Sequence, residues 1–219
     1  VSIKYKNKKD NIKVSINKNS DYNFSWEYID NILLNLGGTS NTINGGDLKG
    51  QGKVLTNSSR LDIYGCSFEK ATNNNSYDLI TNTETGVIEV HDGRFKNTGT
   101  NYNVSIFRNN NNLIIHNGTF IAYKVYVVIN NTPGTLIIDG GTFDNSIELT
   151  VWDSYDGSIV YNAGDATITT IETNYSNCAR NSGTLRVNDS KFTDIRGSAF
   201  YNTSGTITTS DSEVNLNGG

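Results

Sequence analysis

The two histidines of the chain recur at equivalent places in its sequence. His91, His116 and Asp139 each lie four residues before a phenylalanine. Imidazole nitrogens and carboxylate oxygens bind divalent metals, and these side chains would meet if the segments that carry them stacked about 5 Å apart. The sequence therefore offers a metal site at His91, His116 and Asp139. The alternative is an exposed corner that accepts any polar residue, because related segments hold Asn44, Asn188 and Ser210 there.

A second candidate site lies in an insertion at residues 145–157. Trp152 and Tyr155 offer flat rings for stacking on a sugar. Asp153 and Asp156 offer oxygen acceptors for sugar hydroxyls or for a calcium ion. The insertion is therefore the expected ligand-binding loop. The alternative is that Trp152 folds back over the core while the acids keep the loop soluble.

The segments around the histidines belong to a repeat. Each copy has two apolar residues two apart, then a polar or glycine-rich corner, then an aromatic residue, which is typical of a strand with one buried face followed by a bend. The clear copies are residues 61–68, 88–95, 113–120, 136–143 and 185–192. Weaker copies are residues 41–48, 168–175 and 207–214.

A second repeat lies between these segments. Short, mostly apolar runs end in Asn35, Asn57, Asn82, Asn109, Asn130, Asn162, Asn181 and Asn202. Their mean spacing is about 24 residues, a period typical of solenoids. We expect the last seven, from Asn57 onward, to stack at one corner as a structural ladder, because stacked amides satisfy one another.

The two repeats predict an all-β fold, a right-handed parallel β-helix (β-solenoid) of about eight coils over residues 31–219. Residues 1–30 break the pattern and are expected to form an N-terminal β-hairpin cap, and the chain is expected to be a piece of a longer protein with further flanking domains. The core should contain three columns. The first is Leu61, Ile88, Leu113, Leu136, Ile168, Leu185 and Ile207; the second is Ile63, Val90, Ile115, Ile138 and Val187; the third is Phe68, Phe95, Phe120, Phe143, Tyr175 and Phe192. Cys66 and Cys178 would lie about five coils apart, too far for a disulfide, and should be free thiols.

Residues 183–214 resemble the repeats of adhesin-like right-handed parallel β-helix surface proteins, which share the pectin-lyase-like architecture. The run 197–202 (Gly-Ser-Ala-Phe-Tyr-Asn) is loosely similar to an element of the polymorphic outer-membrane repeats. The resemblance implies an extracellular, cell-surface protein with a structural or adhesive role. A glycan or another surface protein would be its partner.

A polysaccharide lyase or hydrolase, or a phage-type fibre, is the alternative on the same fold. The motifs of polygalacturonase-like enzymes do not occur in the sequence, and no pair of carboxylates stands out as glycoside hydrolysis requires. We therefore expect no catalytic residues, and no cofactor beyond the metal ion considered above. The net charge of −4 argues against a nucleic-acid partner. No run approaches the roughly 18 apolar residues of a membrane span, so direct membrane insertion is not expected.

Overall fold

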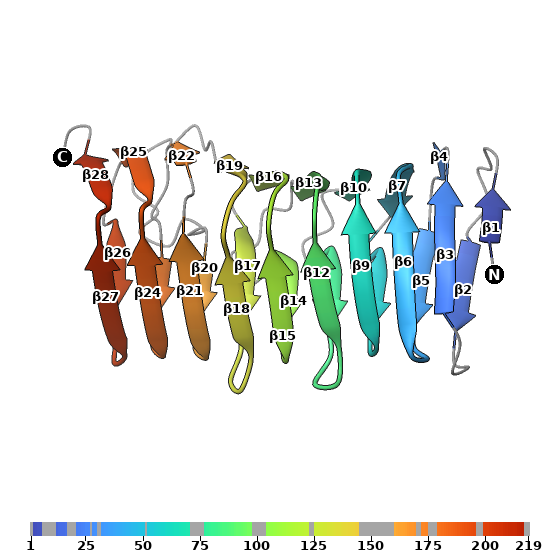
Figure 1. The fold of residues 1–219 in the computed structure, drawn as a ribbon, viewed down its shortest axis with the longest axis horizontal. Helices are drawn as coiled ribbons and strands as arrows, with labels where there is room; N and C mark the ends of the chain where they lie inside the picture. Colours follow the sequence, from blue (N-terminus) through green and yellow to red (C-terminus); the bar gives the residue numbers. More distant parts are fainter. Residues whose placement is uncertain are drawn as a thin grey trace.

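Short strands with alternating inward and outward residues wind the chain into a parallel β-solenoid in the computed structural model (Figure 1). The structure describes residues 2–5, 12–16, 21–26, 28–29, 32–50, 52–70, 77–97, 104–122, 125–144, 160–169, 172–174, 179–195 and 199–216. None of these residues forms a helix, and this part of the chain therefore contains no helix that is long and apolar enough to cross a membrane. The all-β prediction is confirmed.

Each coil contributes strands to three parallel sheets. Sheet 1 consists of β1 (Ser2–Tyr5), β3 (Asp21–Trp26), β6 (Ser40–Asn44), β9 (Arg60–Tyr64), β12 (Val87–Val90), β15 (Asn112–Ile115), β18 (Thr135–Ile138), β21 (Asp165–Thr169), β24 (Thr184–Asn188) and β27 (Thr206–Ser210). Sheet 2 consists of β4 (Tyr28–Ile29), β7 (Asp47–Gly50), β10 (Cys66–Lys70), β13 (Gly93–Asn97), β16 (Thr119–Ala122), β19 (Thr142–Asp144), β22 (Glu172–Asn174), β25 (Lys191–Ile195) and β28 (Glu213–Leu216). Sheet 3 consists of β2 (Ile12–Ile16), β5 (Ile32–Leu36), β8 (Leu55–Asn57), β11 (Ile80–Asn82), β14 (Ser105–Asn109), β17 (Tyr126–Asn130), β20 (Val160–Asn162), β23 (Ala179–Asn181) and β26 (Phe200–Asn202).

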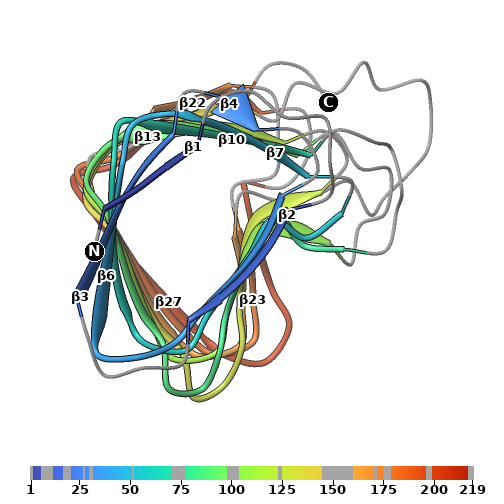
Figure 2. The ribbon, with the colours of Figure 1, turned by 90° about the vertical axis from the view of Figure 1, so that its right-hand side faces the viewer.

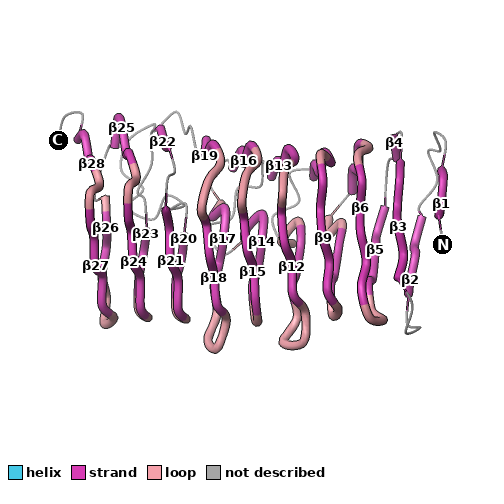
Figure 3. The backbone as a smooth tube through the Cα atoms, in the orientation of Figure 1, coloured by secondary structure: helices cyan, strands magenta, loops and turns pink. Residues whose placement is uncertain are grey.

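The solenoid is right-handed. Seen from its N-terminal end, the chain runs clockwise from sheet 1 to sheet 2 to sheet 3 while it recedes from the viewer (Figure 2). The tube view shows the same succession of strands from one coil to the next (Figure 3). Over the described residues, sheet 1 has ten strands and the other two sheets have nine each, slightly more than the eight coils expected.

The extra strands come from the N-terminal segment. Strand β1 pairs in parallel with β3, and β2 pairs in parallel with β5, so β1 and β2 lie in different sheets. The predicted hairpin between them was therefore wrong. Residues 12, 14 and 16 of β2 are Ile, Val and Ile, and their register partners are Ile32, Leu34 and Leu36. Parallel pairing with a strand distant in the sequence therefore replaces the hairpin that the local turn signal predicted. A domain boundary at residue 30 stays a prediction.

The core follows the predicted columns. Leu61, Ile88, Leu113 and Leu136 are register partners in sheet 1, and all four are fully buried. In sheet 2 the rings of Phe68, Phe95, Phe120 and Phe143 stack along the axis, with centroids 5.3, 5.1 and 4.8 Å apart. The apolar interior is thus continuous from coil to coil.

One repeat was aligned two residues out of register. Ala166 pairs with Leu136 in the first column, and Ile168 pairs with Ile138 in the second. The position beside Phe143 is taken by Thr173, and Tyr175 lies outside the described residues. The cause is that this coil has a threonine at the aromatic position, so the alignment was anchored on Tyr175, two residues further along the chain.

The predicted asparagine ladder is present in the structure at the end of the sheet 3 strands. Each amide nitrogen donates to the amide oxygen of the next coil, at distances from 2.7 to 3.1 Å, from Asn57 through Asn82, Asn109, Asn130, Asn162 and Asn181 to Asn202. The same nitrogens also donate to backbone carbonyls at the adjoining bend, as Asn130 does to Gly134 at 3.0 Å. Asn35 pairs with Thr56 and stands outside the ladder, whose position in that coil is taken by Leu36.

Glycines after the ladder leave space for the amides. A Cβ on Gly134 would lie 2.6 Å from the amide oxygen of Asn130, and a Cβ on Gly86 would come still closer to that of Asn82. Both distances are shorter than the contacts that Cβ atoms make in real proteins. A glycine two to four residues after each ladder asparagine from Asn82 onward is thus a second sequence signal of the ladder, with Asn109 as the exception.

Cys66 is a buried free thiol in the described part of the chain, and Cys178 lies outside that part. Burial raises the pKa of the Cys66 thiol to about 12, and because the thiolate is the reactive form, the folded protein should protect it. We expect thiol titration to show Cys66 unreactive at pH 8 until the chain unfolds, and two free thiols after denaturation without reductant. Detection of no thiol after denaturation would contradict the coil arrangement.

Candidate metal centre

The two histidines lie side by side on the corner between sheets 1 and 2. Each follows directly after a sheet 1 strand, His91 after β12 and His116 after β15. Because the preceding residues Val90 and Ile115 point into the core, alternation turns the histidines outward. The ring of Tyr64 stacks on His91 at 4.2 Å, and the rings of His91 and His116 lie 5.3 Å apart.

Glu89 joins this pair from the neighbouring outward column of β12. Its Oε1 atom lies 2.9 Å from Nε2 of His116 and 3.8 Å from Nε2 of His91. One ligand atom from each of the three residues lies within 4.8 Å of the other two. We call Glu89, His91 and His116 the corner cluster. Glu89 was missed because the sequence was compared only along one column, although it stands two residues before His91 and shares its outward face.

Asp139 holds the opposite edge of the His116 ring. Its Oδ2 atom lies 2.9 Å from Nδ1 of His116, whereas Nε2 of that ring faces Glu89. The sequence grouped Asp139 with the histidines as a metal ligand. The structure brings it next to His116, but in a place that orients the ring and not in the group of three.

Arg60 and Asp62 complete the surroundings of the cluster. The Arg60 guanidinium donates to Oδ1 of Asp62 at 2.9 Å and to Oε2 of Glu89 at 2.6 Å. Asp62 Oδ1 also lies 3.5 Å from Nε2 of His91. Glu89 therefore has one oxygen fixed by Arg60 and the other turned to the histidines. Three carboxylates and one guanidinium give the corner a local charge of −2 when the imidazoles are neutral.

The ionisation of the cluster follows these contacts. The hydrogen bond to Glu89 raises the pKa of His116, with a further contribution from Asp139, while desolvation opposes it. The same hydrogen bond from His116 lowers the pKa of Glu89, helped by Arg60. Without a metal, the form that satisfies both carboxylates is the imidazolium, which donates from both ring nitrogens.

This predicts a pH dependence in the metal-free protein. A His116 pKa above the ordinary value of about 6.5 contributes stability that is fully present below that pH and is lost as pH rises through the raised pKa. An NMR titration should show the imidazole signal of His116 titrating above its usual range, and Glu89→Gln should lower that pKa. An unchanged His116 pKa in Glu89→Gln would show that this contact is absent in solution.

The predicted ligand-binding loop is not tested by the structure. Trp152, Asp153, Tyr155 and Asp156 lie outside the described residues, so a sugar or calcium site there stays a prediction.

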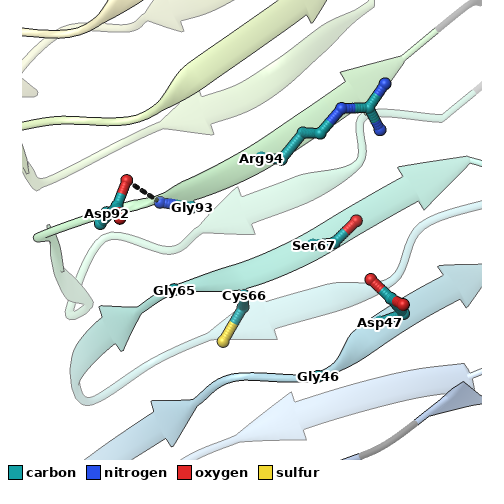
Figure 4. A pocket seen from close by; sticks show the side chains of 8 residues that line it. All are labelled: Gly46, Asp47, Gly65, Cys66, Ser67, Asp92, Gly93 and Arg94. Carbon is teal, nitrogen blue, oxygen red and sulfur yellow. Dashed lines mark hydrogen bonds between the residues drawn. The ribbon is translucent and has the colours of Figure 1, made fainter.

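A shallow polar hollow of about 440 Å³ lies on the sheet 2 side of the same corner (Figure 4). Asp47, Ser67 and Arg94 occupy one outward column on three successive strands, β7, β10 and β13. Glycines 46, 65 and 93 line it at the bends, and the Asp92 carboxylate accepts a hydrogen bond from the Gly93 amide at 2.8 Å. The hollow thus offers an acceptor, a hydroxyl and a guanidinium in one row.

Known proteins add no assignment to this geometry. No family model, curated protein or solved structure matches the chain. The parallel β-solenoid is therefore established by the structure alone.

Proposed function

We propose that the chain is a structural and adhesive segment of an extracellular cell-surface protein, and that its outward side chains contact a glycan or a neighbouring surface. The observations that carry this proposal are the continuous asparagine ladder from Asn57 to Asn202 and the stack of phenylalanines in sheet 2. The ladder amides bond to those of the adjoining coils, so the interior forms a scaffold that does not depend on the outward residues.

The polar hollow supports the adhesive part of the proposal. The carboxylate of Asp47 accepts hydrogen bonds from sugar hydroxyls, the guanidinium of Arg94 donates them, and Ser67 does both. Consecutive parallel strands lie about 4.8 Å apart, so the row of three residues spans two strand-to-strand spacings along the solenoid axis. A hydroxyl-rich chain lying along the axis would contact all three residues.

The alternative on this fold is an enzyme acting on polysaccharides. The outward carboxylates of Asp62 and Glu89 both bond to Arg60, and Glu89 also faces His116. The hydrogen bond from His116 lowers the pKa of Glu89, whereas a glycosidase needs one of its two carboxyls protonated as the acid. This disfavours Glu89 as the catalytic acid.

A glycan array with the purified chain tests the proposal. We expect binding that Asp47→Ala with Arg94→Ala abolishes. The matched control is Asp165→Ala with Arg186→Ala, which removes an exposed carboxylate–guanidinium pair, 2.6 Å apart, on sheet 1 and should leave binding intact. Failure to bind any glycan or cell surface would overturn the adhesive role. Release of reducing ends or unsaturated products from acidic polysaccharides would overturn the non-enzymatic one.

A further inference from the structure

We propose that the corner cluster of Glu89, His91 and His116 binds one divalent transition-metal ion of the zinc class, which links two successive coils of the solenoid. This goes beyond the adhesive role and does not depend on it. Glu89 and His91 belong to the coil of β12, and His116 belongs to the coil of β15. An ion held by all three would join two coils whose strands β12 and β15 are also paired there by backbone hydrogen bonds.

The distances around Glu89 are close to those of a tetrahedral ion. Zinc bonds of about 2.0–2.1 Å place neighbouring ligand atoms about 3.3 Å apart. The Oε1 atom of Glu89 lies 2.9 Å from His116 Nε2 and 3.8 Å from His91 Nε2, and these two values bracket the tetrahedral edge. The three ligand atoms all lie within 4.8 Å of one another, so a bound ion would draw the two imidazoles closer together.

Each of the three ligands already has a second partner that fixes its direction. Tyr64 stacks on the His91 ring with an angle of 3° between the planes. Asp139 bonds to Nδ1 of His116, and Arg60 holds Oε2 of Glu89. A carboxylate behind a metal-bound imidazole is the arrangement that orients such ligands and raises their basicity. Tyr64, Asp139 and Arg60 therefore hold the three ligands in place through contacts that a bound metal would not replace.

The donor set selects the class of ion. Two imidazole nitrogens and one carboxylate suit zinc and its neighbours, whereas calcium and magnesium take oxygen ligands. Binding requires that the proton on Nε2 of His116 leave to solvent as the metal–nitrogen bond forms. The fourth position is open to water or to Asp62, whose Oδ1 lies 3.5 Å from His91 Nε2.

Calorimetric titration of the tag-free, metal-stripped chain with zinc chloride at pH 7.5 tests the site. We expect one zinc per chain and a rise in melting temperature at saturating zinc. His116→Gln and His91→Gln should each abolish both effects. Asp139→Asn should weaken zinc binding by about 10- to 100-fold, the usual effect of losing such an orienting carboxylate. Glu89→Gln should also lose zinc binding, and its matched control is Glu84→Gln, which changes an exposed acid near β12 and should bind zinc as the unaltered chain does.

Three results would overturn the proposal. The first is no heat and no melting shift up to millimolar zinc. The second is zinc binding that survives both histidine substitutions. The third is binding lost in Cys66→Ser but kept in Glu89→Gln, which would move the site to the thiol. The cluster residues are partly exposed, so the variants should fold, and circular dichroism checks each one. A variant that does not fold is replaced by Glu89→Gln with Asp139→Asn, which must then lose the zinc-dependent melting shift.

Discussion

Replacing Phe120 with alanine is expected to lower the free energy of unfolding by about 3–5 kcal/mol. Phe120 is fully buried, and its ring stacks between Phe95 and Phe143 at centroid distances of 5.1 and 4.8 Å. Phe107 meets the same ring edge-on at 6.1 Å. Truncation would leave a cavity in the middle of the stack, where neighbouring coils cannot close without breaking register. Equilibrium denaturation of both proteins measures the difference.

The control for this substitution is an aromatic residue on the surface. Tyr201 is 55% exposed and contacts only the Arg180 guanidinium among the ring interactions described, so Tyr201→Ala should cost about 1 kcal/mol or less. Equal losses for the two variants would mean that the phenylalanine stack contributes no more than a surface ring, contrary to the structure.

Replacing Asn130 with leucine is expected to cost about 1–3 kcal/mol. Asn130 accepts a bond from Asn109 at 2.7 Å and donates to Asn162 at 2.9 Å, and it also bonds to the carbonyls of Gly134 and Asp165. Leucine has a similar volume but removes the donor to the buried amide oxygen of Asn162. The loss should appear as a lower denaturation midpoint with an unchanged slope.

An exposed asparagine provides the matched control. Asn117 lies on the surface, and Asn117→Leu should change stability by about 0.5 kcal/mol or less. The nearby run 110–112 is unsuitable, because Asn110 and Asn111 donate to the carbonyls of Asn82 and Gly86 at 2.7 and 3.0 Å. If Asn130→Leu were as silent as Asn117→Leu, the ladder would have no energetic role.

The architecture was predictable because it repeats. Every coil needs the same inward pattern, so several copies report the position of one column, and the seven ladder asparagines stand at one register position. The prediction was wrong where a coil lacks its marker. Residues 165–169 read Asp-Ala-Thr-Ile-Thr, and the strand that follows has Thr173 in place of phenylalanine. Nothing local then distinguishes Ile168 in the first column from Ile168 in the second.

From the sequence, only those site residues that stand in one column along the solenoid axis could be placed together. The common spacing before phenylalanine placed His91 and His116 together, but the partners that come from a different column depend on side-chain direction. Glu89 reaches across from the next outward column to His116. Asp78 is a similar case in the interior, because its carboxylate accepts bonds from the Ser105 amide and hydroxyl and from Arg108. No repeat marks these contacts, since each joins a single pair of successive coils within the described part of the chain.

The central claim is that residues of successive coils are held closely enough to bind one metal ion. Its most direct test is a zinc-edge anomalous difference map from crystals of the chain grown with zinc. The structure predicts one strong peak within bonding distance of Glu89 Oε1 and of the Nε2 atoms of His91 and His116, on the corner between β12 and β15. A map with no peak there, in crystals where these side chains are ordered, would contradict the account.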